Sequence, residues 1–182
     1  MYKFLFFTAL FLNIFQLNLQ GNHFMQTPYQ YSQVFENEEL DSISVDGSVF
    51  INRTTVSNSV LVNGSLLAKE SNLGSLHVNG AAKVENSLIN NETIINGAIY
   101  AKSTSFEGFF SVASEKTTLK DCEAHLLEVR KINNNKTQQI LELLGNTTIH
   151  GDIKFESQEG LIYVTKGVKI LGEVIGGTVQ FR

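Results

Sequence analysis

Aliphatic residues return along the chain at a nearly constant interval. Six of them are separated by 17, 16, 17, 17 and 17 residues, namely Val45, Val62, Val78, Ile95, Val112 and Val129. Self-similarity at a short fixed period is typical of solenoids, in which every period forms one coil that stacks on the next. The pattern therefore predicts a stack of coils of about 17 residues each.

Within a period, apolar or small residues occupy every second position. The first such row is Val45, Gly47, Val49 and Ile51. Side chains two positions apart share one face of a β-strand, so this row is expected to point into the coil. Two further columns follow, one of Val56, Leu73, Ile89 and Phe106 and one of Val60, Leu76 and Phe110, which Thr93 interrupts. Three apolar stations per coil predict an all-β fold, a single-stranded parallel β-helix with three short strands per coil.

Glycine follows an Asp or Asn residue in four successive periods. An Asn-Gly pair between apolar residues is also the strongest short signal for a β-hairpin turn. Gly47 keeps the parity of Val45 and Val49, whereas a hairpin would interrupt it, so the solenoid is favoured. We expect these glycines to narrow the coil interior and the preceding polar residues, Asp46, Asn63, Asn79 and Asn96, to form an outward ladder. The structural glycines are predicted to be Gly47, Gly64, Gly80, Gly97, Gly151 and Gly172.

The periodicity changes after Val112. Ser114 replaces the glycine and Lys116 falls on an inward position, so this coil is either distorted or shifted by one residue. Residues 131–139 are interpreted as an insertion or loop. Alternation then returns, and it favours a strand over the helix that the stretch QQILELLG would otherwise allow.

The last coil shows a switch of parity. After the Ile175-Gly176-Gly177 step the apolar residues are Val179 and Phe181, as a glycine bulge that adds one residue would allow. The sequence stops at GGTVQFR without a polar cap, and uncovered solenoid ends expose strand edges. We therefore expect self-association, an end-to-end oligomer formed through Val179 and Phe181.

The N-terminus differs from the repeats. Lys3 precedes FLFFTALFLNIF, a run too short to cross a bilayer but suited to the apolar region of a secretory signal. A buried strand or short helix is the alternative. We predict a signal peptide over residues 1–21, a flexible lead-in over 22–42 and the β-helix domain over 43–182. Localisation would then be secreted, periplasmic or at the cell surface, with no transmembrane span.

Composition narrows the possible partners. Lys and Arg number 14 against 18 Asp and Glu, so no basic surplus favours nucleic acid. Cys122 is the single cysteine, so no internal disulfide can form, and burial as a small apolar residue is favoured over an intermolecular crosslink. Five Asn-x-Ser/Thr sequons begin at Asn52, Asn63, Asn91, Asn135 and Asn146, and they matter only in a host that glycosylates.

No motif for catalysis or metal binding emerges. The histidines, His23, His77, His125 and His150, lack the spacing of a metal site, and they are expected on the solvated surface. The phosphate-binding, dinucleotide-binding and nucleophile-elbow motifs are absent, and the carboxylates are scattered over different coils. We therefore expect no catalytic, cofactor-binding or metal-binding residues, no cofactor and no enzymatic activity.

Residues 43–182, with the phrases IHGDIKF and KILGEVIGGTVQF, resemble the bactofilins, polymer-forming cytoskeletal proteins with a compact parallel β-helix. The resemblance implies self-assembly through stacked coil ends without a nucleotide. Bactofilins are typically cytoplasmic, whereas this chain has the features of an exported one. The sequence thus predicts an exported, non-enzymatic structural protein that self-associates. The alternative is a surface adhesin or glycan-binding module, whose partner would be a glycan or the cell surface.

Overall fold

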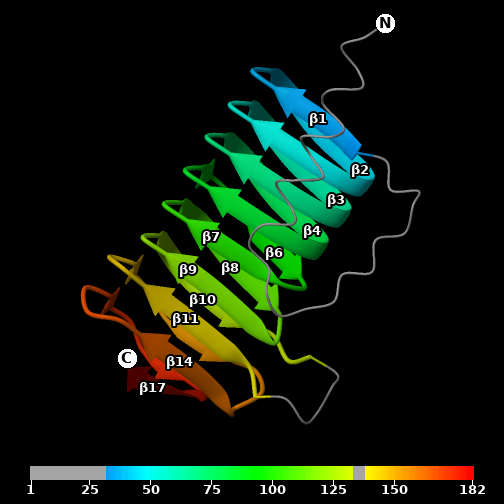
Figure 1. Cartoon of the computed structure of the whole chain (residues 1–182). Helices are drawn as coiled ribbons and strands as arrows, with labels where there is room; N and C mark the ends of the chain where they lie inside the picture. Colours follow the sequence, from blue (N-terminus) through cyan, green and yellow to red (C-terminus); the bar gives the residue numbers. More distant parts are fainter. Residues whose placement is uncertain (1–31, 133–137) are drawn as a thin grey trace, which may run out of the picture.

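The computed structural model describes residues 32–132 and 138–182 as a continuous stack of parallel coils (Figure 1). The strands are β1 (Ser32–Glu36), β2 (Glu39–Asn52), β3 (Thr55–Lys69), β4 (Asn72–Glu85), β5 (Leu88–Ile89), β6 (Thr93–Asn96), β7 (Ile99–Lys102), β8 (Ser105–Ala113), β9 (Lys116–Lys120), β10 (Glu123–Val129), β11 (Ile140–Leu144), β12 (Thr148–Ile149), β13 (Ile153–Phe155), β14 (Gly160–Val164), β15 (Lys169–Ile170), β16 (Val174–Ile175) and β17 (Gly177–Phe181). Within the described ranges there is no helix. The predicted all-β parallel β-helix is confirmed.

Each coil has three walls that we number in chain order. The first wall holds β5, β12 and β15, the second holds β6, β13 and β16, and the third holds β1, β7, β9, β11, β14 and β17. The longer strands β2, β3 and β4 run through all three walls, and β8 and β10 run through the first two. Every strand pairing is parallel, so the Asn-Gly steps make no hairpins.

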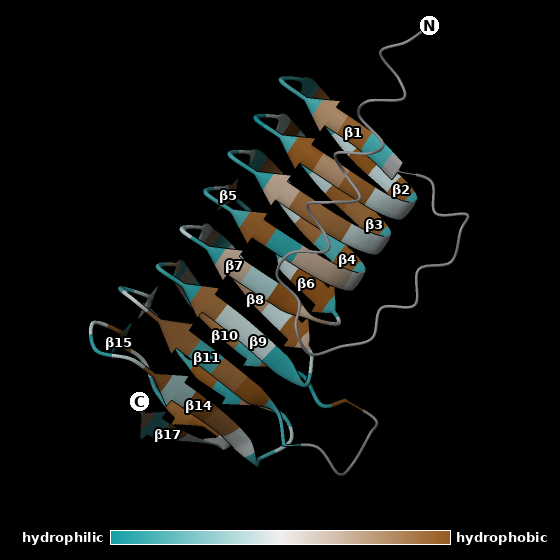
Figure 2. Cartoon of the chain, in the orientation of Figure 1, coloured by the Kyte–Doolittle hydropathy of each residue, from teal (hydrophilic) through white to brown (hydrophobic). Residues whose placement is uncertain are grey.

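The core consists of inward residues that stack in columns from coil to coil, as the alternation predicts. Val45, Val62 and Val78 are register partners, and the same column continues through Ile95, Val112 and Val129. All six are buried, with 0–5% of each side chain exposed. Hydrophobic residues therefore recur in every coil (Figure 2), and burying them is the main force that holds the stack together.

The glycines of the first four coils stack at the corner between the second and third walls. Gly47, Gly64 and Gly80 are register partners, and their φ angles are 129°, 151° and 145°. An added Cβ at Gly80 would overlap the carbonyl oxygen of Gly64, and one at Gly97 would overlap that of Gly80. The stacking is confirmed, but its reason is a positive φ and close backbone approach between coils, not a narrow interior.

Gly151 and Gly172 belong to a different corner, between the first and second walls. A Cβ at Gly172 would overlap the backbone carbonyl of Gly151, and one at Gly151 would overlap the carbonyl oxygen of His125. The two predicted glycines are therefore required by close approach, although they do not continue the column of Gly47.

The solenoid begins earlier than predicted. β1 starts at Ser32 and pairs with the end of β2, so Gln33 and Phe35 are register partners of Val49 and Ile51. The part of the predicted flexible lead-in from residue 32 to 42 is therefore wrong, because pairing with the next coil forms strands there despite weak alternation. The predicted signal peptide and residues 22–31 lie outside the described residues.

The irregular coil after Val112 is shifted by one residue. Ile99 pairs with Thr117, so Thr117 points inward and Lys116 lies on the outer surface, where its Nζ is 3.0 Å from a carboxylate oxygen of Glu142. The predicted insertion lies between β10 and β11, and its residues 133–137 are outside the described ranges. Gln139 joins its two ends by donating to the carbonyl oxygens of Arg130, at 2.8 Å, and Ser114, at 3.0 Å.

The C-terminal half otherwise follows the alternation. Ile140–Leu144 is the strand β11, as the alternation favoured, and not a helix. The parity switch is also confirmed, because Val179 and Phe181 are register partners of the buried Ile162 and Val164.

Candidate interaction surfaces

The C-terminal end of the stack is an exposed apolar surface, which we call the C-terminal end face. It contains Phe181 and Val179, with exposed fractions of 85% and 36%, and the partly buried Ile170 and Val174. Leu171 and Ile175 of the same coil are also exposed, at 63% and 40%, but they point outward from the coil. Val179 and Phe181 occupy inward stations, yet they are covered on one side only, by the preceding coil. The last coil is therefore an open strand edge next to uncovered core residues.

Arg182 holds β17 against the previous coil. Its guanidinium lies 3.4 Å from the centroid of the Tyr163 ring, and its Nη1 is 3.2 Å from a carboxylate oxygen of Glu142. Its backbone N–H donates to the carbonyl oxygen of Val164 at 3.0 Å. The positive charge is thus directed back along the outer surface, and Phe181 beside it stays exposed.

A ladder of side-chain amides follows the outer surface of the second wall, as predicted. Asn63, Asn79 and Asn96 each donate from Nδ2 to the side-chain oxygen one coil earlier, at 2.7, 2.7 and 2.6 Å. Asp46, which can only accept, ends the ladder on one side, and Arg130, which can only donate, ends it on the other. Arg130 was not foreseen, because it reaches past Ala113 to Asn96 from two coils away.

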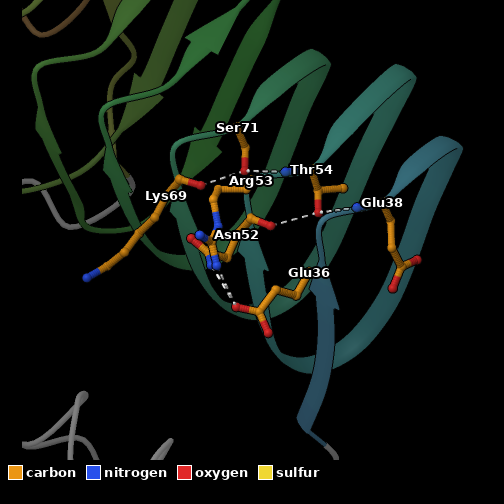
Figure 3. A network of polar contacts seen from close by, with 7 residues as sticks. All are labelled: Glu36, Glu38, Asn52, Arg53, Thr54, Lys69 and Ser71. Atoms are coloured by element: carbon orange, nitrogen blue, oxygen red, sulfur yellow. Dashed lines mark hydrogen bonds and ion pairs between the residues drawn. The ribbon is translucent and has the colours of Figure 1, made fainter.

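A second ladder lies at the corner between the third and first walls, and the sequence analysis missed it (Figure 3). A residue with positive φ, such as Arg53 (49°) or Glu70 (49°), turns the chain there. The next residue carries a buried hydroxyl that bonds the carbonyl two positions back, as Thr54 does to Asn52 and Ser71 to Lys69. Each hydroxyl also accepts the N–H of the preceding coil, which satisfies backbone groups that the turn leaves unpaired.

The sequence did carry a signal for this corner. Ser or Thr recurs at the coil period at Thr54, Ser71, Ser87 and Thr104, and Cys122 is the next member of the column. The Cys122 thiol is 3.2 Å from the carbonyl oxygen of Lys120 and only 1% exposed. Burial raises the pKa of this thiol to about 11, so the favoured prediction of a buried, apolar-type cysteine is confirmed.

A shallow groove runs along the outside of the same corner, with a volume of about 660 Å³. Its lining includes Arg53, Glu70, Asn72, Asn86 and Ser105, so it crosses four successive coils, and apart from Leu88 its lining residues have polar or charged side chains. One charge of each sign makes it nearly neutral.

Several charged side chains on the outer surface form ion pairs. Glu85 lies between Lys83 and Lys69, with distances of 3.0 and 3.1 Å. Burial raises the pKa of Glu85, but the two lysines lower it more, so the net pKa is below its ordinary value. Such a carboxylate stays ionised at neutral pH and is poorly suited to donate a proton.

Two histidines that are distant in sequence meet on adjacent coils. The rings of His125 and His150 stack with centroids 5.2 Å apart, and His125 Nε2 is 3.3 Å from Glu107. His77 instead contacts Glu92 at 3.0 Å on another coil. Over residues 32–132 and 138–182, no three His, Cys, Asp or Glu side chains come together as metal ligands.

Comparison with protein-family models, curated proteins and solved structures found no match. Among the described residues, no helix is long and apolar enough to cross a membrane.

Proposed function

We propose that this chain is an exported, non-enzymatic structural protein that self-associates through the C-terminal end face. One observation carries the proposal, the 85% exposure of Phe181 beside the open edge of β17. An aromatic ring of this size contributes strongly to an interface when it is buried. An open strand edge adds backbone hydrogen bonds to a partner with a matching edge, and a second copy of this chain has one.

The register of the last coil fits a two-fold contact between two copies. Antiparallel pairing of two β17 strands about Val179 would place Phe181 opposite Gly177 of the second copy, where no side chain obstructs the ring. The same two-fold axis would cross the coil and pass near Gly172, at the corner between the first and second walls that faces β17. Ile170 of β15 would then meet Val174 of β16 from the second copy, so the apolar core would continue across the contact.

Export and the lack of catalysis are supported by other observations. The apolar run after Lys3 fits a secretory signal, although it lies outside the described residues. Carboxylates such as Glu85 and Glu142 are engaged in ion pairs with lysine or arginine, which is typical of a structural surface. The resemblance to bactofilins agrees with self-assembly without a nucleotide.

The polar groove favours one second candidate, a glycan-binding or adhesin role. Its hydroxyl and amide side chains repeat from coil to coil and could bond the hydroxyls of an extended glycan. Purified protein that stays monomeric and is retained on a glycan array would support this candidate over self-association.

Sedimentation velocity of the wild type and of Phe181→Asp tests the proposal. The wild type should sediment as an oligomer, and Phe181→Asp as a monomer with an unchanged circular dichroism spectrum, because a charge cannot be buried in the contact. Phe109→Asp is the matched control, since Phe109 is also exposed (39%) but lies on a middle coil, and it should remain oligomeric. A wild type that is monomeric at high concentration would contradict the proposal.

The arrangement of the two copies can be tested separately. In a Cys122→Ser background, Val179→Cys should form an intermolecular disulfide, because the two-fold axis brings the two copies of residue 179 together. An oligomer that does not crosslink would show that the end face meets a different part of the second copy.

A further inference from the structure

Four of the five sequons lie in the described residues, and their asparagines are in different environments. Asn52 donates to Glu36 at 2.8 Å, and Asn63 is bonded on both sides within the amide ladder. Asn91 and Asn146 are exposed, and neither side chain has a hydrogen-bond partner. Asn135 lies outside the described residues. Among the four sequons in the described ranges, only those of Asn91 and Asn146 have an amide nitrogen that is exposed and without a hydrogen bond.

Asn91 lies next to a glycine on each of the two adjacent coils. It lies in the bend between β5 and β6, and its backbone N–H donates to the carbonyl oxygen of Gly74 on the preceding coil. On the following coil its register neighbour is Gly108, where an added Cβ would overlap the carbonyl oxygen of Asn91. These two glycines have no side chain that could obstruct a group attached to Asn91.

An exposed apolar pair lies beside this space. Phe109 directly follows Gly108 and is 39% exposed, and its register partner Leu126 is 42% exposed. An uncovered phenyl ring and a leucine on adjacent coils form a small apolar platform next to Asn91. The ring hydrogens of a pyranose can pack on the face of an aromatic ring, which removes apolar surface of both groups from water.

We propose that Asn91 is an acceptor for an N-linked glycan and that the first sugar packs on Phe109. Before the chain folds, while Thr93 of the sequon is still accessible, the Asn91 amide nitrogen forms a bond to the anomeric carbon of a lipid-diphosphate-linked oligosaccharide. The bond from that carbon to the diphosphate breaks, the diphosphate leaves with the electron pair, and the amide loses one proton. The glycan then projects from a corner of a middle coil, away from both ends of the stack.

The other sequons differ from Asn91 in ways that can be compared. A sugar on Asn63 would be crowded by Asp46 and Asn79, whose side chains contact it at 2.7 Å on each side. Asn146 is exposed, and its side-chain oxygen faces Gly167 on the next coil. Folded protein should therefore carry glycan at Asn91, and only there should the glycan gain stabilisation from an aromatic ring.

The test is secretion of the full chain from a eukaryotic host that glycosylates, behind that host's own leader, with glycopeptide mass spectrometry of the folded product. We expect a glycan at Asn91, no glycan at Asn63, and loss of the Asn91 glycopeptide in Asn91→Gln. Folded protein without a glycan at Asn91 would overturn the proposal.

A second measurement tests the role of Phe109. Removal of the glycan with a peptide-N-glycosidase should lower the melting temperature of the wild type by a few degrees, and should have less effect on Phe109→Ala. Asn146→Gln is the matched control and should leave this difference unchanged. Equal effects of deglycosylation on the wild type and on Phe109→Ala would refute packing of the sugar on the ring.

Discussion

At the scale of single residues, Cys122 occupies a station where other coils have a hydroxyl. Cys122→Ser should keep the hydrogen bond to Lys120 and fold normally, because Ser71 and Ser87 occupy the same station. The native thiol should react slowly with a thiol reagent at pH 8, because it is buried and its pKa is raised to about 11. Fast reaction without denaturant would contradict this burial.

The same pKa has a consequence for stability. A thiol whose pKa is raised on folding contributes fully below its unfolded value of 9.0, and the contribution is lost as the pH rises toward about 11. The free energy of unfolding of the wild type should therefore fall relative to Cys122→Ser by about 2 kcal/mol over this interval. Denaturant titrations of both proteins at several pH values measure the difference.

Thr93 is the polar member of an otherwise apolar column. Its hydroxyl is fully buried between Leu76 and Phe110 and has no hydrogen-bond partner. Thr93→Val should raise the free energy of unfolding by about 1 kcal/mol, because it removes an unsatisfied polar group. Thr104→Val is the matched control and should lower stability, since the Thr104 hydroxyl bonds Lys102 at 2.9 Å. Equal effects would mean that the Thr93 hydroxyl finds a partner.

At the scale of the structural elements, the glycine corner limits what each coil can tolerate. Gly80→Leu should lower the melting temperature strongly, by the equivalent of about 3 kcal/mol or more. The reasons are that φ is 145° and that any Cβ overlaps the adjacent coil. Ala98→Leu changes the exposed residue after Gly97 and should have little effect. An unchanged melt for Gly80→Leu would mean that the corner can open.

The amide ladder and the hydroxyl ladder stabilise different parts of each coil. The amide ladder follows the second wall, and the hydroxyl ladder follows the corner between the third and first walls. The amide ladder lies in solvent and was visible in the sequence, because Asp and Asn recur next to glycine. The hydroxyl ladder is buried, and it follows turns made by residues as different as Arg53, Glu70 and Asn86. The shared backbone conformation is therefore not visible in the residue types. Hydrogen bonding to the carbonyl and N–H groups of the neighbouring coils imposes this conformation.

At the scale of the whole molecule, the open end couples stability to concentration. If the C-terminal end face binds a second copy, the melting temperature of the wild type should rise with protein concentration. The melting temperature of Phe181→Asp should stay constant, because the charge prevents association. Differential scanning calorimetry over a hundredfold range of concentration checks this, and a concentration-independent wild type would argue against the contact.

The sequence by itself determined the coil length, the three-walled parallel fold, the inward columns and the outward Asn ladder. These features follow from one local rule, that every second side chain of a strand faces the same side, and from its repetition along the chain. The stacked glycines followed from the same rule, although the reason for them did not.

Only the tertiary structure decided the features that depend on contacts between coils. Pairing with β2 formed β1 in a segment that alternates poorly, a one-residue shift placed Lys116 outside, and Arg130 reached across two coils to end the ladder. The stacking of His125 on His150 and the glycines around Asn91 likewise depend on which residues the coils bring into register. The apolar pattern sets which inward residues stack, but it does not specify which outward side chains meet or where the number of residues per coil changes.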